Sequence, residues 1–553
     1  MYKSKIRSEI EKVLDALQIT NKIEFTVEKP AEERFGDYAT NIALVLASKL
    51  KKSPLEIAKD VVSKLPKKAQ IERVEIEAPG FINFYLTKKS LISNLENILK
   101  KGDKYGSSEL GRGVKIVLEH TDVNPNKALH IGHLRSACLG SACAEILKFL
   151  GFKVETQYYV DDTGMQVAVS ALGVLDLNID QEEGEKYDHF AGRAYVAAME
   201  ALDKNKKFAS RFDRGLEKKK EEIIAVLDKQ EGQSLDFIKK FINQVLKSNL
   251  DTTDLFGINY DLLIWESDIL KGKFWEKTFE LLKACPNFYQ AKKGKNKGCW
   301  VLKTNKSTNQ DEDSEKVIVK TNVVITYTGK DIAYHLWKYN LLGVDFKYAK
   351  WSGGNYKKSI WSTSWEGKSN NSFGQADKVI NFIDSRQSYP QVVVKNSLVV
   401  LNHKKEADTL KHVGYGVVSL APKTAKELGA EASLGKTQYA MSGRLGLAVL
   451  VDDLLDLVKA KLKQKYPKSP ETEQVASAAI KYLMLAYNPY SDIVFSYEQA
   501  LDINGNSGPY LQYAYARCNS VLKKATKVKK LVPAFNRGII KYSKDFDKIE
   551  YTV

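Results

Sequence analysis

The sequence predicts an α/β protein whose central domain is built on a parallel sheet, and two observations lead to this fold class. From Val114 onward, short apolar runs alternate with segments of helical periodicity, first 114–118, then 137–150, then 153–160. Such alternation is typical of parallel strands joined by helices. The regions on either side of this alternation have other patterns. The residues before it suggest a small separate α/β module, and the far end of the chain has helical periodicity. At 553 residues the chain is also too long for a single core.

The first 108 residues predict a domain of mixed helices and strands. One helix has a well-marked start, because Ser53 can cap it, Pro54 suits its first position and Glu56 can close a capping box. The expected elements of this domain are, in order, helix 2–17, strand 22–28, helix 37–50, the helix that starts at 53, strands 71–77 and 81–86 around the turn 78–80, and a polar linker at 102–113.

The rest of the chain predicts the parallel-sheet domain and a helical end. Gly151 is expected to stop the first helix of the sheet domain. The expected elements are strand 114–118, helix 137–150, strand 153–160 with the turn 161–164, charged helices at about 190–250, an exposed loop at 303–316, strands 317–319, 325–327 and 379–383, and helices 475–487 and 509–524.

Composition narrows the class of protein. The formal net charge is +17 with a pI near 9.2, which favours an anionic partner such as nucleic acid. None of the five cysteines lies in a CxxC pair, so reduced thiols are expected instead of a disulfide framework or a zinc site. The chain starts with a charged helix, not an apolar signal core, and no apolar run is long enough for a membrane span. A cytoplasmic protein is expected.

The segment between the first sheet strand and its helix predicts a phosphate-binding site. It contains Lys127, His130, Gly132 and His133, directly before a helix. A helix start offers unpaired N–H groups and the positive end of a dipole. The histidines can donate to phosphate oxygens, Lys127 can add a charge, and Gly132 lets a ligand approach the backbone. The four-residue pattern H-x-G-H is weak by itself, since a buried histidine is often only a core residue.

The context makes this pattern specific, because residues 116–167 resemble the first half of the catalytic core of class I aminoacyl-tRNA synthetases, and the arginyl-tRNA synthetase family in particular. Further motifs of that family occur in the expected order at 35–41, 78–84, 158–164, 326–335, 386–391, 414–419 and 502–513. The resemblance implies a Rossmann-type parallel-sheet catalytic domain at 112–465, an N-terminal additional domain at 1–108 and a helical anticodon-binding domain at 467–553. This last domain is shorter than the family's usual bundle.

The resemblance also implies a pocket for L-arginine. A guanidinium group is always charged and presents a planar fork of donors, so its pocket needs carboxylates and amide oxygens. By resemblance, Glu119, Tyr327, Asp331 and Gln387 form this pocket, and Asn124 binds the backbone part of the amino acid. Asp331 follows Tyr327 by four residues, which places both on one face if that segment is helical. Asp122 stands where many relatives have serine.

The second class I signature is degenerate in this chain. The family's usual Lys-Met-Ser-Lys-Ser is replaced by a segment from Ala440 that contains Met441, Ser442 and Arg444, and both lysines are missing. In many arginyl-tRNA synthetases with such a signature, a lysine just before the histidine motif is thought to supply the phosphate charge. Lys127 occupies that place. Cations at the pyrophosphate would lower the barrier to its departure, so Lys127 and Arg444 join His130 and His133 as the expected catalytic residues, while Gly132, Met441 and Ser442 are expected to help bind ATP.

The implied activity is that of an arginine–tRNA ligase. The arginine carboxylate attacks the α-phosphate of ATP, and the terminal ribose of tRNA(Arg) then attacks the arginyl-adenylate. Mg²⁺ is expected to arrive with ATP, without a protein metal site, and adenylate formation is expected to require tRNA. Asn83 and Tyr85 are the expected contacts to the tRNA elbow, and a monomer is expected. Two alternatives remain: an adenylyl or nucleotidyl transferase with an H-x-G-H site, and an impaired or truncated relative that only binds tRNA.

Overall fold

The computed structural model of the chain describes residues 2–19, 23–203, 211–303, 315–354, 356, 358–370, 372–428, 439–440, 449–467 and 471–527. Two compact units are present, one that includes residues 1–107 and one of residues 108–524. All five cysteines are free thiols, as expected. Within the described ranges, the longest apolar helical stretches all fall short of what a membrane span requires.

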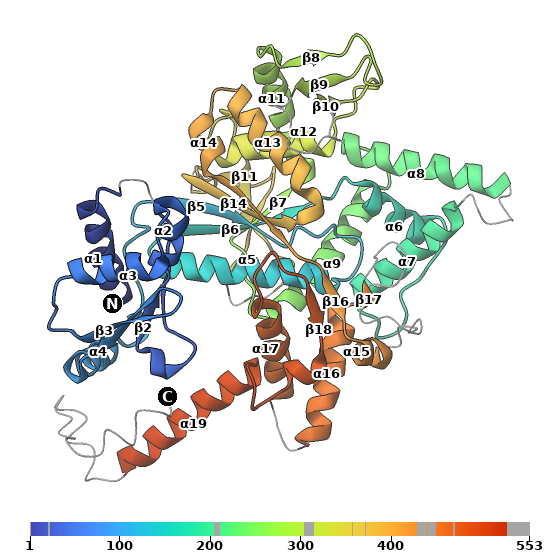
Figure 1. Cartoon of the computed structure of the whole chain (residues 1–553). Helices are drawn as coiled ribbons and strands as arrows, with labels where there is room; N and C mark the ends of the chain where they lie inside the picture. The colour runs from blue at the N-terminus through green and yellow to red at the C-terminus, as the bar shows by residue number, and fades with distance from the viewer. Residues whose placement is uncertain are drawn as a thin grey trace. The chain divides into compact units, whose positions relative to one another are not determined.

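The first unit is a four-stranded antiparallel sheet in the order β1-β2-β4-β3 with helices packed on it (Figure 1). Ser53 N–H donates to Glu56 Oε2 at 3.3 Å, so the expected capping box is confirmed. Its elements are α1 (Tyr2–Ala16), β1 (Val27–Glu28), η1 (Glu33–Phe35), β2 (Tyr38–Thr40), α2 (Ile42–Leu50), α3 (Pro54–Lys64), β3 (Ile71–Glu77), β4 (Phe81–Leu86), α4 (Lys88–Lys101) and η2 (Gly102–Lys104).

Two expectations for this unit need correction. The helix expected at 37–50 starts only at Ile42, because residues 38–40 pair with β4 as a strand, with Tyr38 opposite Phe84. The strand expected at 22–28 is confined to Val27–Glu28 within the described residues. In both regions the sequence pattern does not mark the ends of the strand. Pairing with the neighbouring strand sets those ends.

The second unit is built on an eight-stranded sheet in the order β13-β11-β12-β7-β6-β5-β14-β15. The six strands from β12 to β15 are parallel to one another, whereas β11, near one edge, pairs antiparallel with both β12 and β13. The expected parallel α/β core is therefore confirmed. The strands are β5 (Lys115–Glu119), β6 (Lys153–Val160), β7 (Leu262–Trp265), β11 (Lys347–Lys350), β12 (Trp361–Thr363), β13 (Lys368–Ser369), β14 (Lys378–Asp384) and β15 (Leu410–Tyr415).

Helices cover this sheet, and α5 lies against its central strands β5, β6 and β14 (Figure 1). The other helical segments form an insertion between β6 and β7 and a layer on the opposite side. These helices are α5 (Ile131–Phe149), α6 (Met165–Leu175), α7 (Tyr187–Leu202), α8 (Arg211–Lys229), α9 (Leu235–Asp254), α10 (Glu266–Lys271), α11 (Phe274–Lys283), α12 (Tyr327–Lys338), η3 (Ser385–Gln387), α13 (Ser388–Val400) and α14 (Lys404–Thr409). Helix α15 (Pro422–Glu427) instead packs with the C-terminal elements.

Two boundaries in this region differ from expectation. The helix expected from Ala137 starts at Ile131, directly after the histidine that caps it. The strand expected at 325–327 is wrong, because Ile325 forms only an isolated bridge to Val319 and Tyr327 is the first residue of α12. A small antiparallel sheet, β8 (Phe288–Gln290), β9 (Trp300–Lys303) and β10 (Glu315–Val319), precedes that helix.

The C-terminal part of the second unit is mainly helical and is tied to α5. Arg135 on α5 is fully buried and donates to the carbonyl oxygens of Asn488, Pro489 and Ser491 at 3.0–3.1 Å. The domain boundary expected near 465–467 lies inside this one unit and stays a prediction. The remaining elements are β16 (Val418–Leu420), β17 (Tyr439–Ala440), α16 (Val451–Lys465), α17 (Thr472–Leu485), β18 (Ile493–Phe495), α18 (Tyr497–Ala500) and α19 (Gly508–Lys527).

Candidate active site

The two histidines of the phosphate motif cap α5 reciprocally. His133 N–H donates to His130 Nδ1 at 3.2 Å, and His130 N–H donates to His133 Nδ1 at 3.3 Å. Their rings stack with centroids 3.4 Å apart. Because each Nδ1 accepts a hydrogen bond, each neutral ring carries its proton on Nε2. The pair therefore presents two Nε2–H donors at the start of a helix that follows a central parallel strand.

The protonation of this pair is set mainly by burial. Burial lowers the pKa of His130 to about 4, and the nearby charge of Lys127 acts in the same direction. Burial also lowers the pKa of His133 well below its usual value, with His130 and Lys127 again adding to the effect. Both rings are thus neutral at pH 7 and can act as hydrogen-bond donors, not as cations. A phosphate bound here would need its positive charge from another residue.

Gly132 is required by the histidine stack. A Cβ atom at this position would lie 3.1 Å from two atoms of the His130 ring. We expect Gly132→Ala to displace that ring and raise the KM for ATP about tenfold, while helix propensity keeps the free energy of unfolding within ~1 kcal/mol of the original. Gly215→Ala on α8 is the matched control, because its Cβ would meet open space. Steady-state kinetics and thermal unfolding of both variants test this expectation. A KM for ATP that is the same in Gly132→Ala as in the unsubstituted protein would contradict it.

Lys127 lies beside the histidines and against the helical insertion. Its ammonium is 5.1 Å from the centroid of the Tyr195 ring on α7. Its charge contributes to the lowered pKa of both histidines. Lys127 therefore brings a positive charge close to the place where the Nε2–H groups would hold a phosphate.

Met441, Ser442 and Arg444 of the degenerate signature lie outside the described residues, and only the chain on either side of them is described. On one side, β17 pairs with β16. On the other side, Leu450 forms an antiparallel bridge with His130, and Val451 N–H donates to Leu129 O at 2.8 Å. The described chain therefore resumes beside the backbone of the histidine motif.

Glu119, expected in the arginine pocket, is held by a residue that the sequence did not reveal. It ends β5, is 5% exposed and forms an ion pair with Lys338 on α12. Lys338 Nζ also donates to Asn381 Oδ1 at 3.3 Å, and Asn381 Nδ2 donates to Gln391 Oε1 at 3.0 Å. One of the expected carboxylates is thus already neutralised by a buried lysine. The signal that could have found it is helical spacing, since Lys338 lies seven residues after Asp331 on the same face.

Asp331 and Asp161 give this region its excess of carboxyl groups. Burial raises the pKa of Asp331 to about 8, and the neighbouring Glu119 and Glu266 act in the same direction. Burial and Glu266 raise the pKa of Asp161 to about 7. Asn124 Nδ2 donates to Asp161 Oδ2 at 2.9 Å, which brings the expected backbone-binding residue to the same cluster. Carboxyl groups with raised pKa values favour a cationic ligand, because such a ligand would stabilise their ionised form.

Asp122 belongs to a strained turn that starts directly after β5. Thr121 and Asp122 both have positive φ angles, 79° and 46°, which residues other than glycine seldom adopt. Asp122 Oδ1 accepts a hydrogen bond from Tyr159 N–H at 2.8 Å, and burial raises the pKa of this carboxyl well above its usual value. The turn fixes the path of the chain from Glu119, the last residue of β5, to the two histidines.

Tyr327 and Gln387 lie on the more open side of this region. Tyr327 starts α12 one turn before Asp331, as expected, and is 55% exposed. Gln387 precedes α13 and is also exposed. Lys316 lies near the start of both helices. Its ammonium is 5.7 Å from the ring centroid of Tyr327 on α12 and 5.1 Å from that of Tyr389 on α13. No hydrogen bond joins Gln387 to Asp331 within the described parts of the chain.

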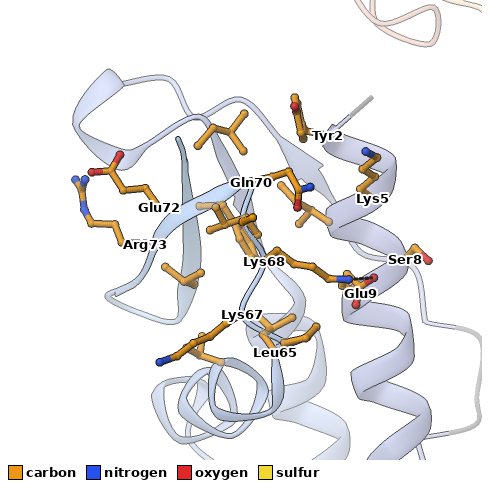
Figure 2. Close-up of a pocket in the computed structure, with 18 of the residues that line it drawn as sticks. Tyr2, Lys5, Ser8, Glu9, Leu65, Lys67, Lys68, Gln70, Glu72 and Arg73 are labelled. Atoms are coloured by element: carbon orange, nitrogen blue, oxygen red, sulfur yellow. Dashed lines mark ion pairs between the residues drawn. The ribbon is translucent and has the colours of Figure 1, made fainter. Parts of the chain in front are cut away.

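The residues expected to meet tRNA lie on β4 in the first unit. Asn83 is 3% exposed, and Tyr85 donates its hydroxyl to Arg34 O at 2.6 Å while Arg73 stacks 3.6 Å from its ring centroid. A groove of about 1040 Å³ also lies in this unit. Figure 2 shows basic side chains along it, with Lys68 paired to Glu9. The groove contains none of the residues expected to bind ATP or arginine, and neither Asn83 nor Tyr85 lines it.

Comparison with known proteins connects both units to one family. Residues 2–86 match the family model described as "Arginyl tRNA synthetase N terminal domain", and residues 94–347 match "tRNA synthetases class I (R), catalytic domain". The chain is 36% identical to the arginine–tRNA ligase of Pyrococcus furiosus, over 95% of this chain and 83% of that protein. It is 32% identical to an arginine–tRNA ligase of Thermus thermophilus, over 90% and 78% respectively. The solved Thermus thermophilus arginyl-tRNA synthetase superposes with a TM-score of 0.77 at 30% identity, covering 95% of this chain and 82% of the other.

Proposed function

Since this chain belongs to the arginyl-tRNA synthetase family and is an arginine–tRNA ligase with a class I catalytic domain, we propose how its own residues carry out the reaction. The observation that carries the proposal is the cluster of Asp331, Asp161 and Glu119 beside the histidine-capped helix. This arrangement offers a site for a cation next to a site for phosphate. Arginine and ATP are the substrates that have these charges.

In the first step, the arginine carboxylate attacks the α-phosphorus of ATP, and pyrophosphate leaves. His130 and His133 donate hydrogen bonds to phosphate oxygens, and Gly132 leaves room for ATP beside the helix start. Lys127 and Arg444 stabilise the charge that grows on the pyrophosphate. Met441 and Ser442 contact ATP from the signature segment. Mg²⁺ enters as part of the substrate, bound to the phosphates of ATP.

The arginine side chain lies in the carboxyl cluster in this proposal. Asp331 and Glu119 accept hydrogen bonds from the guanidinium, and Lys338 fixes the orientation of Glu119. Tyr327 and Gln387 close the pocket from its exposed side. Asn124, which Asp161 orients, binds the backbone part of the amino acid. No side chain forms a covalent intermediate, so positioning and charge stabilisation supply the catalysis.

In the second step, the terminal ribose hydroxyl of tRNA(Arg) attacks the carbonyl carbon of the adenylate, and AMP leaves. In this proposal Tyr85 in the first unit contacts the tRNA elbow, whereas Asn83 is too buried to do so. The C-terminal helices contact the anticodon through unpaired bases in this proposal. The positive net charge of the chain favours this partner. A monomeric state and a cytoplasmic location remain predictions.

Charging of total tRNA with each of the twenty amino acids tests the proposal. We expect arginine alone to be attached, and arginine-dependent exchange of pyrophosphate to require tRNA. Attachment of another amino acid, or an ATP reaction without any tRNA, would support the transferase alternative instead. Binding of tRNA without charging would identify a relative that has lost activity.

A further inference from the structure

Two helices of the insertion between β6 and β7 hold the backbone around Lys127. Ser170 Oγ on α6 donates to Asn126 O at 3.0 Å. With its amide oriented so that both neighbouring acceptors are satisfied, Asn249 on α9 donates to Lys127 O at 3.3 Å and to Asp188 Oδ2 at 3.0 Å. The side chains of Asn126 and Asn249 are fully buried. The insertion therefore fixes two successive carbonyl groups of the chain that leads to the histidine motif.

A further helix of the insertion, α7, places the side chain of Lys127. Gly192 and Tyr195 are three residues apart and lie on one face of this helix. A Cβ atom at Gly192 would lie 3.4 Å from Lys127 Cβ, so the glycine lets the lysine pack directly against the helix. The Tyr195 side chain is buried, and its ring centroid is 5.1 Å from Lys127 Nζ. At this separation the face of an aromatic ring attracts an ammonium group.

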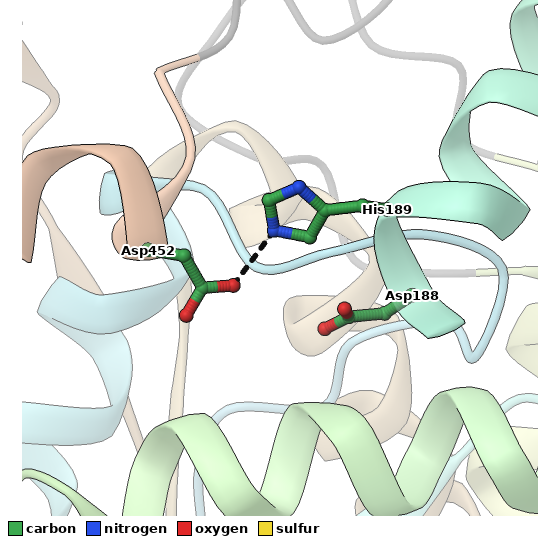
Figure 3. Close-up of side chains that lie close together, drawn as sticks. All are labelled: Asp188, His189 and Asp452. Carbon is green, nitrogen blue, oxygen red and sulfur yellow. Dashed lines mark hydrogen bonds and ion pairs between the residues drawn. The ribbon is translucent and has the colours of Figure 1, made fainter. Parts of the chain in front are cut away.

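A cluster of charged side chains fastens the first turn of α7 to α16. Asp452 Oδ2 on α16 is 2.8 Å from both Lys186 Nζ and His189 Nε2, and Lys186 Nζ is 3.2 Å from Asp188 Oδ2. Figure 3 shows Asp452 and His189 facing each other, with Asp188 beside them. Among the described residues, these three form the one group with the spacing of metal ligands. The Lys186 ammonium supplies the positive charge between the two carboxylates, so the cluster anchors α7.

The contacts of Lys127 determine where its charge lies. Burial is the main cause of the low pKa of His130 and of His133, and the charge of Lys127 lowers both further, so the ammonium is close to the two rings. A lysine side chain that is not held samples many rotamers, and fixing it on a ligand costs entropy. Because α7 and α9 already hold this lysine, less of that cost remains when a phosphate binds.

We propose that Tyr195 and Asn249 are positioning residues for Lys127. Asn249 fixes the backbone of Lys127, and the Tyr195 ring fixes the direction of its side chain. The ammonium is then in place when negative charge grows on the departing pyrophosphate. This inference rests on the proposed role of Lys127 at the phosphates. It gives the helical insertion a part in the first step of the reaction, separate from the arginine pocket.

Pyrophosphate exchange in the presence of tRNA tests the role of Tyr195 in the full chain. Tyr195→Leu removes the ring face, and we expect kcat for adenylate formation to fall about tenfold while the KM for arginine stays within about twofold. Tyr195→Phe keeps the ring face and should recover most of that loss. Tyr187→Leu is the matched control, because Tyr187 lies on the same helix and its ring packs on Phe190 and Phe241. It should leave kcat unchanged.

Two further variants test the contacts on either side of Tyr195 and serve if Tyr195→Leu folds poorly. Asn249→Ala removes both hydrogen bonds of the amide and should lower kcat about tenfold. Gly192→Val suits a helix better than glycine does, and it should displace the Lys127 side chain and lower kcat in the same way. Asn243→Ala is the control for α9, because Asn243 is exposed and donates to Lys239 O of its own helix. Normal kcat in Asn249→Ala and Gly192→Val would contradict the proposal.

A double-mutant cycle with Lys127→Ala separates positioning from a general loss of stability. If Tyr195 acts through Lys127, the effect of Tyr195→Leu on kcat should shrink to less than about twofold in the Lys127→Ala background. Equal fold-changes in the two backgrounds overturn the inference. A slow Lys127→Ala beside a normal Tyr195→Leu overturns the inference alone, whereas a normal Lys127→Ala overturns the proposed role of Lys127 and the inference with it.

Discussion

Replacing Asp331 with asparagine is expected to lower kcat/KM for arginine by about two to four orders of magnitude, because removing one partner of a buried ion pair costs ~3–5 kcal/mol. The asparagine keeps the shape of the side chain and loses the charge that the guanidinium would meet. The KM for ATP should stay close to normal. Aminoacylation kinetics over a wide range of arginine concentrations measure the effect.

The pH dependence of arginine binding should identify the same carboxyl group. The pKa of Asp331 is about 8, so at pH 7 most of it is protonated before arginine binds. Arginine pairs with the ionised form, and binding must release this proton. The KM for arginine should therefore fall about tenfold for each pH unit as the pH rises from about 6 toward 8, and level off above that. In Asp331→Asn this dependence should be lost.

Glu276→Gln is a suitable control for this change, because Glu276 is an exposed carboxylate on α11, the helix that packs against α12. It should leave both KM values unchanged. A normal KM for arginine in Asp331→Asn would exclude Asp331 from the pocket. Calorimetry in buffers of different ionisation enthalpy gives an independent check, since it counts the protons released when arginine binds.

The phosphate side of the site could be predicted from sequence because its residues are contiguous. The segment from Glu119 to His133 lies between one strand and one helix, so local patterns placed it at the end of a parallel strand. Helix α5 starts six residues before its expected position, since two histidines and a glycine are weak helix signals. The reciprocal hydrogen bonds of His130 and His133 begin this helix instead of a Ser, Thr or Asp cap.

The residues that adjust the charge of the site could not be predicted in the same way. Lys338 pairs with Glu119 across 219 residues of sequence, and a lysine is normally expected at the surface. Asp452 meets His189 across 263 residues. Such pairs depend on how the helices pack on the sheet, which local periodicity does not specify. The β-branched run before Tyr327 suggested a strand, but Thr326 at its end is the N-cap of α12, which begins at Tyr327.

Lys127→Ala is the second change with a large expected effect. It should lower kcat for adenylate formation about 100- to 1000-fold, the range seen when one preorganised group that stabilises transition-state charge is removed. The physical reason is the neutral state of His130 and His133, which leaves the departing pyrophosphate without positive charge from the histidine pair. Pyrophosphate exchange in the presence of tRNA measures this step, and the KM for arginine should not change.

The comparison of three variants distinguishes charge from packing at this position. Lys127→Arg keeps the charge and should retain much of the activity, whereas Lys127→Met keeps the length of the side chain and should behave like Lys127→Ala. Lys148→Ala is the control, because Lys148 lies at the far end of α5 in an exposed pair with Glu145. Unchanged turnover of Lys127→Ala would mean that Lys127 does not replace the missing signature lysines, and that the signature segment supplies the charge by itself.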